Sequence, residues 1–282
     1  MRDADKPGPD GHEKTGPHRD AVIEVENLVT HYGEHRVLND INLTVRAGEI
    51  LVIMGGSGSG KSTLLNHLLG LLNPTHGTVR LLGEDINTLS LLEMTDLRRK
   101  MGVAFQGGAL FSSMTVGDNI LLPLREHTRL DEQTMRIMMR LKMEVVNLAG
   151  AEDLMPAELS GGMIKRAAFA RAVIMDPQIL FCDEPSAGLD PIVASSIDKL
   201  ILDLRAAFDM TIVVVTHERE SALAIADRIC VLDRGEILVL DTVENVKNSP
   251  EPRVQDLLNR RAEVPEVDPD AYLARLTRGI LS

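Results

Sequence analysis

Cysteines, aromatic residues and long apolar runs are scarce in this sequence. Its two cysteines, Cys182 and Cys230, are too few among 282 residues for a disulfide scaffold, and they fit a reducing cytosol. We therefore expect two free thiols. No stretch approaches the roughly 18 to 20 uninterrupted apolar residues of a membrane-spanning helix, so we expect no bilayer crossing. With no tryptophan and only two tyrosines, few side chains can stack on a planar ligand.

Basic residues are also fewer than acidic ones. Acidic residues outnumber lysine and arginine by 42 to 30, which gives a formal net charge of -12. Such a surplus argues against broad electrostatic capture of nucleic acid or of anionic lipid, so we expect partners to meet a local surface. Residues 1–20 combine Pro7, Pro9 and Pro17 with many charges and contain no apolar segment. We expect them to form a disordered tail rather than a secretory signal.

The pattern that is present is that of an α/β fold. A chain of this length with 44% hydrophobic residues can bury a full core, as one large domain or one domain with subdomains. Short apolar runs alternate with segments of helical periodicity. The expected strands are 49–54, 179–183, 211–216 and 228–232, with one helix from Lys61 and another from Pro191. This alternation predicts a mostly parallel sheet with helices on its faces.

The helix from Pro191 has a defined beginning and a defined buried face. Asp190 is a favoured N-cap residue, and proline is favoured at the first helical position. An apolar stripe with helical spacing follows, made of Val193, Ile197, Leu200, Ile201 and Leu204. We expect this stripe to pack on the sheet.

Two further regions surround this core. Residues 22–30 and 36–45 are expected to form antiparallel strands joined by a turn at Gly33, as a separate β layer. Helical patterns dominate between about 91 and 171, which predicts a helical subdomain. Its methionines at helical spacing are typical of adaptable core packing; they are Met135, Met138, Met139 and Met143.

The last part of the sequence differs in composition. From about Ser249, prolines surround two short helical patches, 254–261 and 271–278. We expect residues 249–282 to form a C-terminal extension outside the core.

The strongest motif is a glycine-rich loop. Residues 55–62 read Gly-Gly-Ser-Gly-Ser-Gly-Lys-Ser, which fits G-x-x-x-x-G-K-[ST] between a predicted strand and a predicted helix. Its glycines let backbone N–H groups turn towards phosphate oxygens, Lys61 neutralises the β- and γ-phosphates, and Ser62 coordinates magnesium. ATP and Mg²⁺ are therefore the predicted ligands. The predicted nucleotide-binding residues are Gly55, Gly56, Ser57, Gly58, Ser59, Gly60, Lys61, Ser62 and Thr63.

Two carboxylates end a predicted apolar strand. Asp183 closes the run 179–183, where its carboxylate can meet the magnesium held by Ser62, directly or through a water. Glu184 is placed to polarise the attacking water. An isolated Asp-Glu pair is more often a solvated strand end, but the glycine loop upstream favours the catalytic interpretation.

In this order the motifs resemble those of the nucleotide-binding subunit of an ATP-binding cassette (ABC) transporter. Residues 159–162, Leu-Ser-Gly-Gly, resemble the family signature, and 164–172 resemble its signature helix. The other matches are Gln106 (glutamine loop), 186–190 (D-loop), His217 (switch histidine) and Tyr32 (the aromatic that stacks on adenine). The resemblance covers about residues 21–244. It implies a P-loop NTPase (RecA-like) core with an antiparallel β layer and a helical signature subdomain, in a nucleotide-binding domain over residues 21–248.

The resemblance also implies roles for these residues. Ser160, Gly161 and Gly162 open a helix, whose N–H groups and dipole form an anion site. In the family this site closes over the γ-phosphate held by a second copy, so a homodimer is implied. His217 would contact the γ-phosphate and help to hold the attacking water. Gln106 would reach the same water and the metal.

A narrower resemblance concerns the substrate. The usual signature ends in glutamine, but position 163 is Met163, which has no amide for hydrogen bonding. The Leu-Ser-Gly-Gly-Met form, followed by Lys165 and Arg166, and the stretch 250–254 resemble the ATPase of Mla-type (Mce-linked) phospholipid transport systems. This implies a peripheral ATPase at the cytoplasmic face of the bacterial inner membrane. It would drive a separately encoded permease that maintains the lipid asymmetry of the outer membrane.

That resemblance implies several partners. Besides a second copy and integral membrane permease subunits, they include a small cytosolic regulatory protein and a periplasmic Mce-type lipid-binding protein. Phe111, Met114 and Val116 lie where the family forms a groove for the permease's coupling helix, although local packing is an equal alternative for each. The extension from Ser249 would reach the other ATPase copy. No nucleic-acid partner is expected.

Three alternative functions stay open. The first is the ATPase of an importer for amino acids or another small solute. The second is a soluble ABC ATPase of translation or DNA repair, but those commonly carry two cassettes or a long inserted coiled coil, and we find neither pattern in this sequence. The third is a small-molecule kinase with the same phosphate loop, which would leave Gln106 and residues 160–162 without a role.

Overall fold

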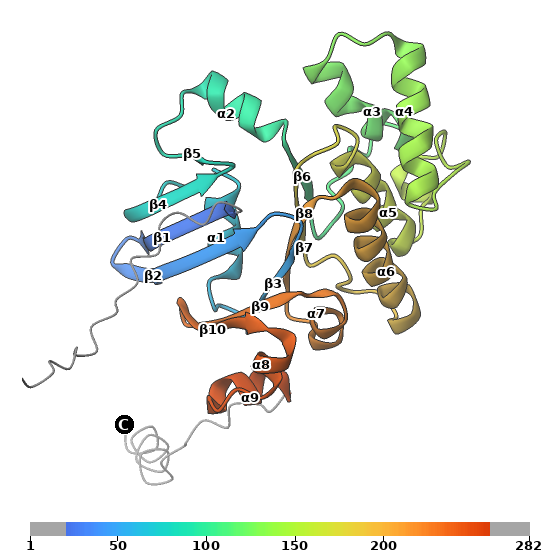
Figure 1. Cartoon of the computed structure of the whole chain (residues 1–282). Helices are drawn as coiled ribbons and strands as arrows, with labels where there is room; N and C mark the ends of the chain where they lie inside the picture. The colour runs from blue at the N-terminus through green and yellow to red at the C-terminus, as the bar shows by residue number, and fades with distance from the viewer. Residues whose placement is uncertain (1–20, 260–282) are drawn as a thin grey trace, which may run out of the picture.

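The computed structural model describes residues 21–259, and Figure 1 shows two sheets with helices around them. The larger sheet has six strands in the order β10-β9-β3-β8-β7-β6. They are β3 (Ile50–Met54), β6 (Met101–Ala104), β7 (Ile179–Asp183), β8 (Thr211–Thr216), β9 (Arg228–Asp233) and β10 (Glu236–Thr242). Neighbours from β9 to β6 are parallel, and β10 is antiparallel to β9. The predicted α/β class is confirmed.

A second, antiparallel sheet forms the predicted β layer. Within residues 21–259 its order is β2-β1-β4-β5. The strands are β1 (Ala21–Tyr32), β2 (His35–Arg46), β4 (His76–Leu81) and β5 (Glu84–Asp85). β1 and β2 form the predicted hairpin, with Tyr32 opposite His35 and Gly33 in the turn at φ 61°. β4 and β5, which sequence patterns did not predict, extend the layer on the other side of β1.

Helices cover both faces of the larger sheet. They are α1 (Lys61–Leu68), α2 (Leu91–Arg98), α3 (Val116–His127), α4 (Glu132–Val145), α5 (Gly161–Ala172), α6 (Pro191–Phe208), α7 (Arg219–Ile225), α8 (Val243–Lys247) and α9 (Pro252–Leu258), with a 3-10 turn over Pro156–Glu158. Leu64, Leu65 and Leu68 of α1 pack with the small sheet and with one face of the larger sheet. Residues of α3, α4, α5 and α6 pack with the other face, in a second core cluster.

Helix α6 follows its predicted beginning and face. The Asp190 carboxylate accepts hydrogen bonds from the N–H groups of Ile192 and Val193, both 3.1 Å long. The buried residues of the helix are Ile197, Leu200, Ile201 and Leu204. The N-cap and the apolar stripe therefore predicted this helix correctly, apart from Val193, which is only half-buried.

Both cysteines lie in the interior. Cys182 in β7 and Cys230 in β9 are fully buried and form no disulfide, so the predicted free thiols are confirmed. Across residues 21–259, no helix is long and apolar enough to cross a membrane.

The segment 91–171 is not helical throughout. β6 lies inside it and pairs with β7 at the edge of the larger sheet. In Figure 1, α2 lies on the side of the small sheet, away from α3, α4 and α5, which cluster together. After α2 the chain returns to the larger sheet as β6. The helical subdomain therefore begins at α3 and not at residue 91. Met135, Met139 and Met143 are buried in the core there, as expected for packing methionines.

The structure corrects the expectation that the chain from Ser249 lies outside the core. Val254 and Leu258 of α9 are 0% and 3% exposed, and both belong to a main core cluster. Arg253 forms an ion pair with Asp233 at the end of β9, 2.6 Å between nitrogen and oxygen. The prolines that suggested an appendage include one at the first position of α9, where proline favours a helix. Residues 1–20 and the patch 271–278 lie outside the described residues.

This packing makes α9 a stabilising element. Deleting residues 249–282 is expected to lower the free energy of unfolding by about 3–6 kcal/mol, because burial of two aliphatic side chains contributes about 1.5–3 kcal/mol each. Urea denaturation followed by circular dichroism measures this loss. Deletion of residues 260–282 leaves α9 in place and is the matched control. Equal stability of the two truncated proteins would contradict a structural role for α9.

Candidate functional site

Most of the predicted phosphate-binding and catalytic residues follow four neighbouring parallel strands. The order β3-β8-β7-β6 places the carboxyl ends of these strands side by side at one edge of the larger sheet. The loop 55–60 follows β3, and His217 follows β8. Asp183 ends β7 with Glu184 directly after it, and Gln106 follows β6. Open α/β sheets bind ligands at this edge. The topology therefore gathers residues that are far apart in the sequence.

The loop 55–60 turns tightly from β3 into α1. Gly60 immediately precedes α1 with φ 105°, a conformation that favours glycine. A Cβ atom on Gly55 would lie 2.2 Å from the carbonyl oxygen of Leu232, so a larger residue cannot stand there. The loop leads into the N-terminus of α1, where free N–H groups and the helix dipole attract anions. Its backbone therefore has the geometry of a phosphate-binding loop.

Lys61 lies against the loop that it follows. Its ammonium donates hydrogen bonds of 2.9 and 2.8 Å to the carbonyl oxygens of Gly55 and Gly56. Burial lowers the pKa of Lys61, while the nearby carboxylates of Glu184 and Asp183 raise it. A partly desolvated cation at this place favours an anionic ligand. The lysine and the two carboxylates thus belong to one electrostatic cluster.

Glu184 is held between β7 and β8. Its carboxylate accepts a hydrogen bond of 3.2 Å from the Thr216 hydroxyl and lies 2.8 Å from Nδ1 of His217. The Glu184 backbone has φ 46°, in the left-handed region, and its N–H donates to the carbonyl oxygen of Val215. Strained backbone of this kind occurs at functional sites, where surrounding contacts maintain it. The contacts fix the carboxylate beside a histidine whose side chain is 55% exposed.

Oxygen donors suitable for magnesium lie at the same edge. Burial, and then the charge of Glu184, raise the pKa of Asp183. Ser62 and Gln106 are exposed. Residues 21–259 contain no cluster of three or more His, Cys, Asp or Glu that could hold a metal. Magnesium needs no such cluster, because it takes one or two carboxylates and completes its shell with water and phosphate oxygens. The hydroxyl, carboxylate and amide oxygens present here fit that ion.

The signature residues line a different pocket. Ser160 is the N-cap of α5, and its hydroxyl accepts a hydrogen bond of 3.3 Å from the N–H of Met163. Residues 160–162 line a pocket of 410 Å³ together with 188–190, and no residue of the loop 55–62 lines it. The structure therefore does not bring the signature to the glycine loop of its own chain. The helix start remains available to an anion supplied by another molecule.

Four other predicted residues have distinct surroundings. Tyr32 ends β1 and is 52% exposed, so its ring is free to stack on a planar ligand. Thr63 is half-buried in α1. Met163 is partly buried and packs against the core, where an amide would gain little. Val116 is fully buried at the start of α3, and its N–H donates to the carbonyl oxygen of Leu154. For Val116 the structure therefore confirms the local-packing alternative and contradicts a place in a surface groove.

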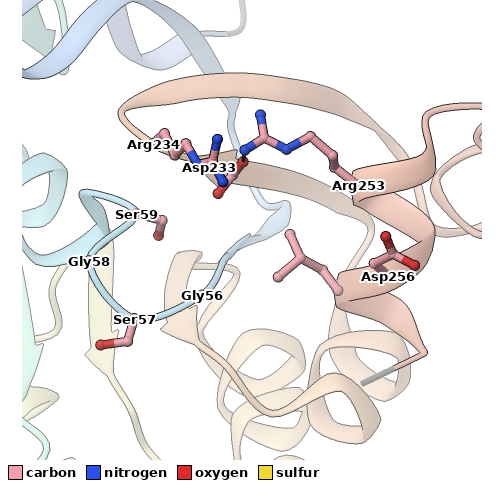
Figure 2. Close-up of a pocket in the computed structure, with 9 residues that line it drawn as sticks. Gly56, Ser57, Gly58, Ser59, Asp233, Arg234, Arg253 and Asp256 are labelled. Atoms are coloured by element: carbon pink, nitrogen blue, oxygen red, sulfur yellow. Dashed lines mark ion pairs between the residues drawn. The ribbon is translucent and has the colours of Figure 1, made fainter. Parts of the chain in front are cut away.

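Sequence patterns did not predict that α9 and the β9–β10 turn line a pocket together with the glycine loop. Figure 2 shows α9 across a pocket from the loop, with the β9–β10 turn beside both. The pocket measures 310 Å³ and is lined by Gly56, Ser57, Gly58, Ser59, Asp233, Arg234, Arg253, Asp256 and Leu257. The available signal was the apolar spacing of Val254, Leu257 and Leu258, which is helical but covers little more than one turn.

Comparisons with known sequences agree with this geometry. The profile of the family described as "ABC transporter" matches residues 38–187. The "Intermembrane phospholipid transport system ATP-binding protein MlaF" of Haemophilus influenzae is 41% identical over 86% of this chain and 92% of its own length. The "Probable ribonucleotide transport ATP-binding protein mkl" of Mycobacterium leprae is 42% identical over 85% of this chain and 69% of its own length.

Solved structures share the fold. A dimeric ATP-binding cassette in a post-hydrolysis state, bound to ADP and Pi, is 33% identical with a TM-score of 0.72, over 78% of this chain and 98% of that one. The protein cbiO1 of Clostridium perfringens, part of the ABC transporter complex cbiONQ, is 29% identical with a TM-score of 0.76, over 86% and 96%. The predicted P-loop NTPase fold is thereby confirmed. This chain belongs to the ABC transporter family, as one of its ATP-binding and ATP-hydrolysing subunits.

Proposed function

We propose that this chain hydrolyses ATP with Mg²⁺ to drive phospholipid transport through a separately encoded membrane permease. The MlaF proteins of Haemophilus influenzae and Escherichia coli K12 support the substrate, since the chain is 41% and 39% identical to them and spans 92% and 91% of their lengths. The observation that carries the hydrolytic role is the contact between Glu184, which follows β7, and His217, which follows β8, the strand next to β3 that leads into the glycine loop.

The residues divide the chemistry of hydrolysis among them. Backbone N–H groups of the loop 55–62 hold the phosphates, and Lys61 neutralises charge that develops on the γ-phosphoryl oxygens. The Glu184 carboxylate, kept in place by Thr216, accepts a hydrogen bond from the attacking water. His217 holds that water and the γ-phosphate. Water activation and charge stabilisation therefore come from adjacent strands of one sheet.

The remaining site residues bind the metal and the base. Ser62, Asp183 and Gln106 would hold magnesium, whose charge neutralises the β- and γ-phosphate oxygens. The exposed ring of Tyr32 would stack on adenine. These assignments place the triphosphate along the carboxyl ends of the parallel strands and the base near the β layer.

A second copy would complete each site. Residues 160–162 line a pocket apart from the loop 55–62 of their own chain, so their anion site needs a phosphate from another molecule. Two dimeric structures of one ATP-binding cassette, MJ0796, whose chains are 33% and 34% identical to this one, support this arrangement. Each nucleotide would then lie between the glycine loop of one copy and the signature of the other.

The permease would dock beside the glutamine loop. Phe105 and Phe111 are 39% and 51% exposed, and both line a groove of 300 Å³ that also includes Arg98, Leu122 and Arg171. Exposed aromatic residues next to arginines are typical of protein–protein contacts. A coupling helix of the permease is the proposed occupant. This contact would hold the chain at the cytoplasmic face of the bacterial inner membrane.

Affinity purification of the tagged chain from bacterial membranes tests this function. We expect hydrophobic permease subunits, an Mce-type lipid-binding protein and a small cytosolic regulatory protein to co-purify. Phe111→Asp should remove the permease, because a charge buried in an apolar contact is costly. Ile137→Asp changes another exposed apolar residue, on α4, and should retain it. Recovery of the wild-type chain without any integral membrane protein would contradict the proposal.

Transport of a small solute such as a ribonucleotide is the second candidate. The mkl protein of Mycobacterium leprae favours it at 42% identity, but this chain spans only 69% of that protein. Lipid extraction from the purified complex separates the two candidates. Bound phospholipid supports the first, whereas stimulation of hydrolysis by a ribonucleotide in a complex without bound lipid supports the second.

A further inference from the structure

Lys165 is a buried lysine on α5, the helix that begins at the signature. It is only 7% exposed. An ammonium group is rarely buried, because removing it from water is costly unless hydrogen-bond partners compensate. The partners of Lys165 therefore indicate why a lysine stands there.

The Lys165 ammonium joins two segments of the hydrolysis site. It donates one hydrogen bond to the backbone carbonyl oxygen of Gln106 and another, 3.0 Å long, to that of Glu184. These residues follow the neighbouring strands β6 and β7. A lysine has three N–H donors and can hold two carbonyls at once. One side chain thus ties the signature helix to both the glutamine loop and the catalytic strand.

The Glu184 backbone depends on such support. Its φ of 46° lies in the left-handed region, which is uncommon for a residue other than glycine, asparagine or aspartate. The carbonyl oxygen of Val215 holds the Glu184 N–H, and Lys165 holds the Glu184 carbonyl, so both sides of the residue have a partner. Without the Lys165 bond, the backbone can relax and carry the carboxylate away from His217.

The surrounding charges agree with this role. Burial lowers the pKa of Lys165, whereas the nearby carboxylates of Asp183 and Glu184 raise it. Among the other cations of α5, Arg166 donates to the carbonyl oxygen of Val146, and Arg171 donates to the carbonyl oxygens of Gly108 and Ala109 in the glutamine loop; neither of these bonds reaches Glu184. The link to Glu184 therefore comes from the lysine and not from a general excess of positive charge on the helix.

We propose that Lys165 is a positioning residue for ATP hydrolysis, which holds the Glu184 backbone in the geometry that activates water and couples it to the glutamine loop. The inference rests on the proposed hydrolytic role of Glu184. It predicts a loss of turnover without a loss of ATP binding, because the hydrogen bonds of Lys165 go to Gln106 and Glu184 rather than to the loop 55–62.

Lys165→Met tests this role, because methionine keeps much of the length of lysine but cannot donate. In the membrane-purified complex, kcat is expected to fall about 10- to 100-fold, the scale of a small misplacement of catalytic groups. The Kd for N-methylanthraniloyl-ATP should stay within about 2-fold, as expected for a residue that acts on the chemical step. Lys165→Arg retains N–H donors and should restore most of kcat.

Lys142 supplies the matched control. It is also 7% exposed, pairs with Asp176, and lies 3.8 Å from the ring centroid of Phe208. Lys142→Met removes a comparable buried ammonium from a different contact, so it should lower stability but leave kcat unchanged. If Lys165→Met gives no folded complex, Lys165→Leu replaces it, because leucine also has no N–H donor, and the same loss of kcat relative to Lys165→Arg is expected.

Hydrogen exchange provides a readout that needs no turnover. The backbone amides of residues 105–110 and 184–186 should exchange faster in Lys165→Met than in the wild-type chain, and should be unchanged in Lys142→Met. A kcat equal to that of Lys142→Met, or a loss of ATP binding as large as the loss of kcat, would overturn the inference. Failure of the proposed role of Glu184 looks different, because Glu184→Gln would then hydrolyse ATP at the wild-type rate.

Discussion

Lys61→Ala is expected to lower the rate of ATP hydrolysis by at least about 100- to 1,000-fold, the scale for removal of one preorganised donor to developing negative charge. The Lys61 ammonium lies against Gly55 and Gly56 and within the field of Glu184 and Asp183. Alanine removes both its charge and its donors, so ATP binding should weaken together with turnover. Phosphate release and binding of a fluorescent ATP analogue measure the two effects separately.

Two controls separate chemistry from folding. Lys199→Ala removes a lysine from an exposed position of α6 and should leave both measurements unchanged. Thermal unfolding without nucleotide then shows whether Lys61→Ala has also loosened the loop, since the carbonyl oxygens of Gly55 and Gly56 lose their partner. If Lys61→Ala hydrolyses ATP at the wild-type rate, the assignment of residues 55–62 as a phosphate-binding loop is wrong.

Glu184→Gln is expected to lower turnover by about 100- to 10,000-fold, the usual contribution of general acid–base catalysis, while ATP binding persists. Glutamine has nearly the same shape, and its amide can still bond to Thr216 and His217. It cannot, however, draw a proton from the attacking water. ATP should therefore stay intact between two copies, and the chain should elute as a dimer when Mg-ATP is present.

Size-exclusion chromatography with and without Mg-ATP measures this trapping. Glu220→Gln is the matched control, because Glu220 is exposed in the first turn of α7. That variant should hydrolyse ATP normally and accumulate no stable dimer. A Glu184→Gln variant that remains monomeric with Mg-ATP and turns over rapidly would refute both the catalytic role and the shared site.

Features that depend on short segments were predictable from the sequence. The glycine loop, the capped start of α6 and the apolar strands each follow local rules of backbone geometry and capping. Because carboxyl ends of parallel strands meet at one edge, the strand that ends at Asp183 also placed this carboxylate near the glycine loop, whereas the place of His217 followed from the family resemblance. The sheet order then confirmed this edge without any adjustment of the strand boundaries around Asp183.

Features that depend on distant contacts were not predictable. Nothing near Val116 reveals that its N–H will donate to the carbonyl oxygen of Leu154. The apolar spacing after Pro252 indicates a short helix, but it does not reveal that α9 will pack in the core. Lys165 likewise bonds to Gln106 and Glu184, which are distant from it in the sequence and come close to it only in the folded sheet. A lysine on an otherwise apolar helix face suggests a buried cation, but the sequence does not identify its hydrogen-bond partners.

Both sulfhydryl groups lie inside the protein, Cys182 in β7 and Cys230 in β9. Burial raises the pKa of both thiols, for Cys230 to about 12, so neither supplies the reactive thiolate at neutral pH. A maleimide dye or a nitroxide label would therefore attach at one engineered surface cysteine without prior removal of the native ones. The approach and separation of two labelled copies could then be followed by energy transfer or electron spin resonance in an otherwise unaltered chain.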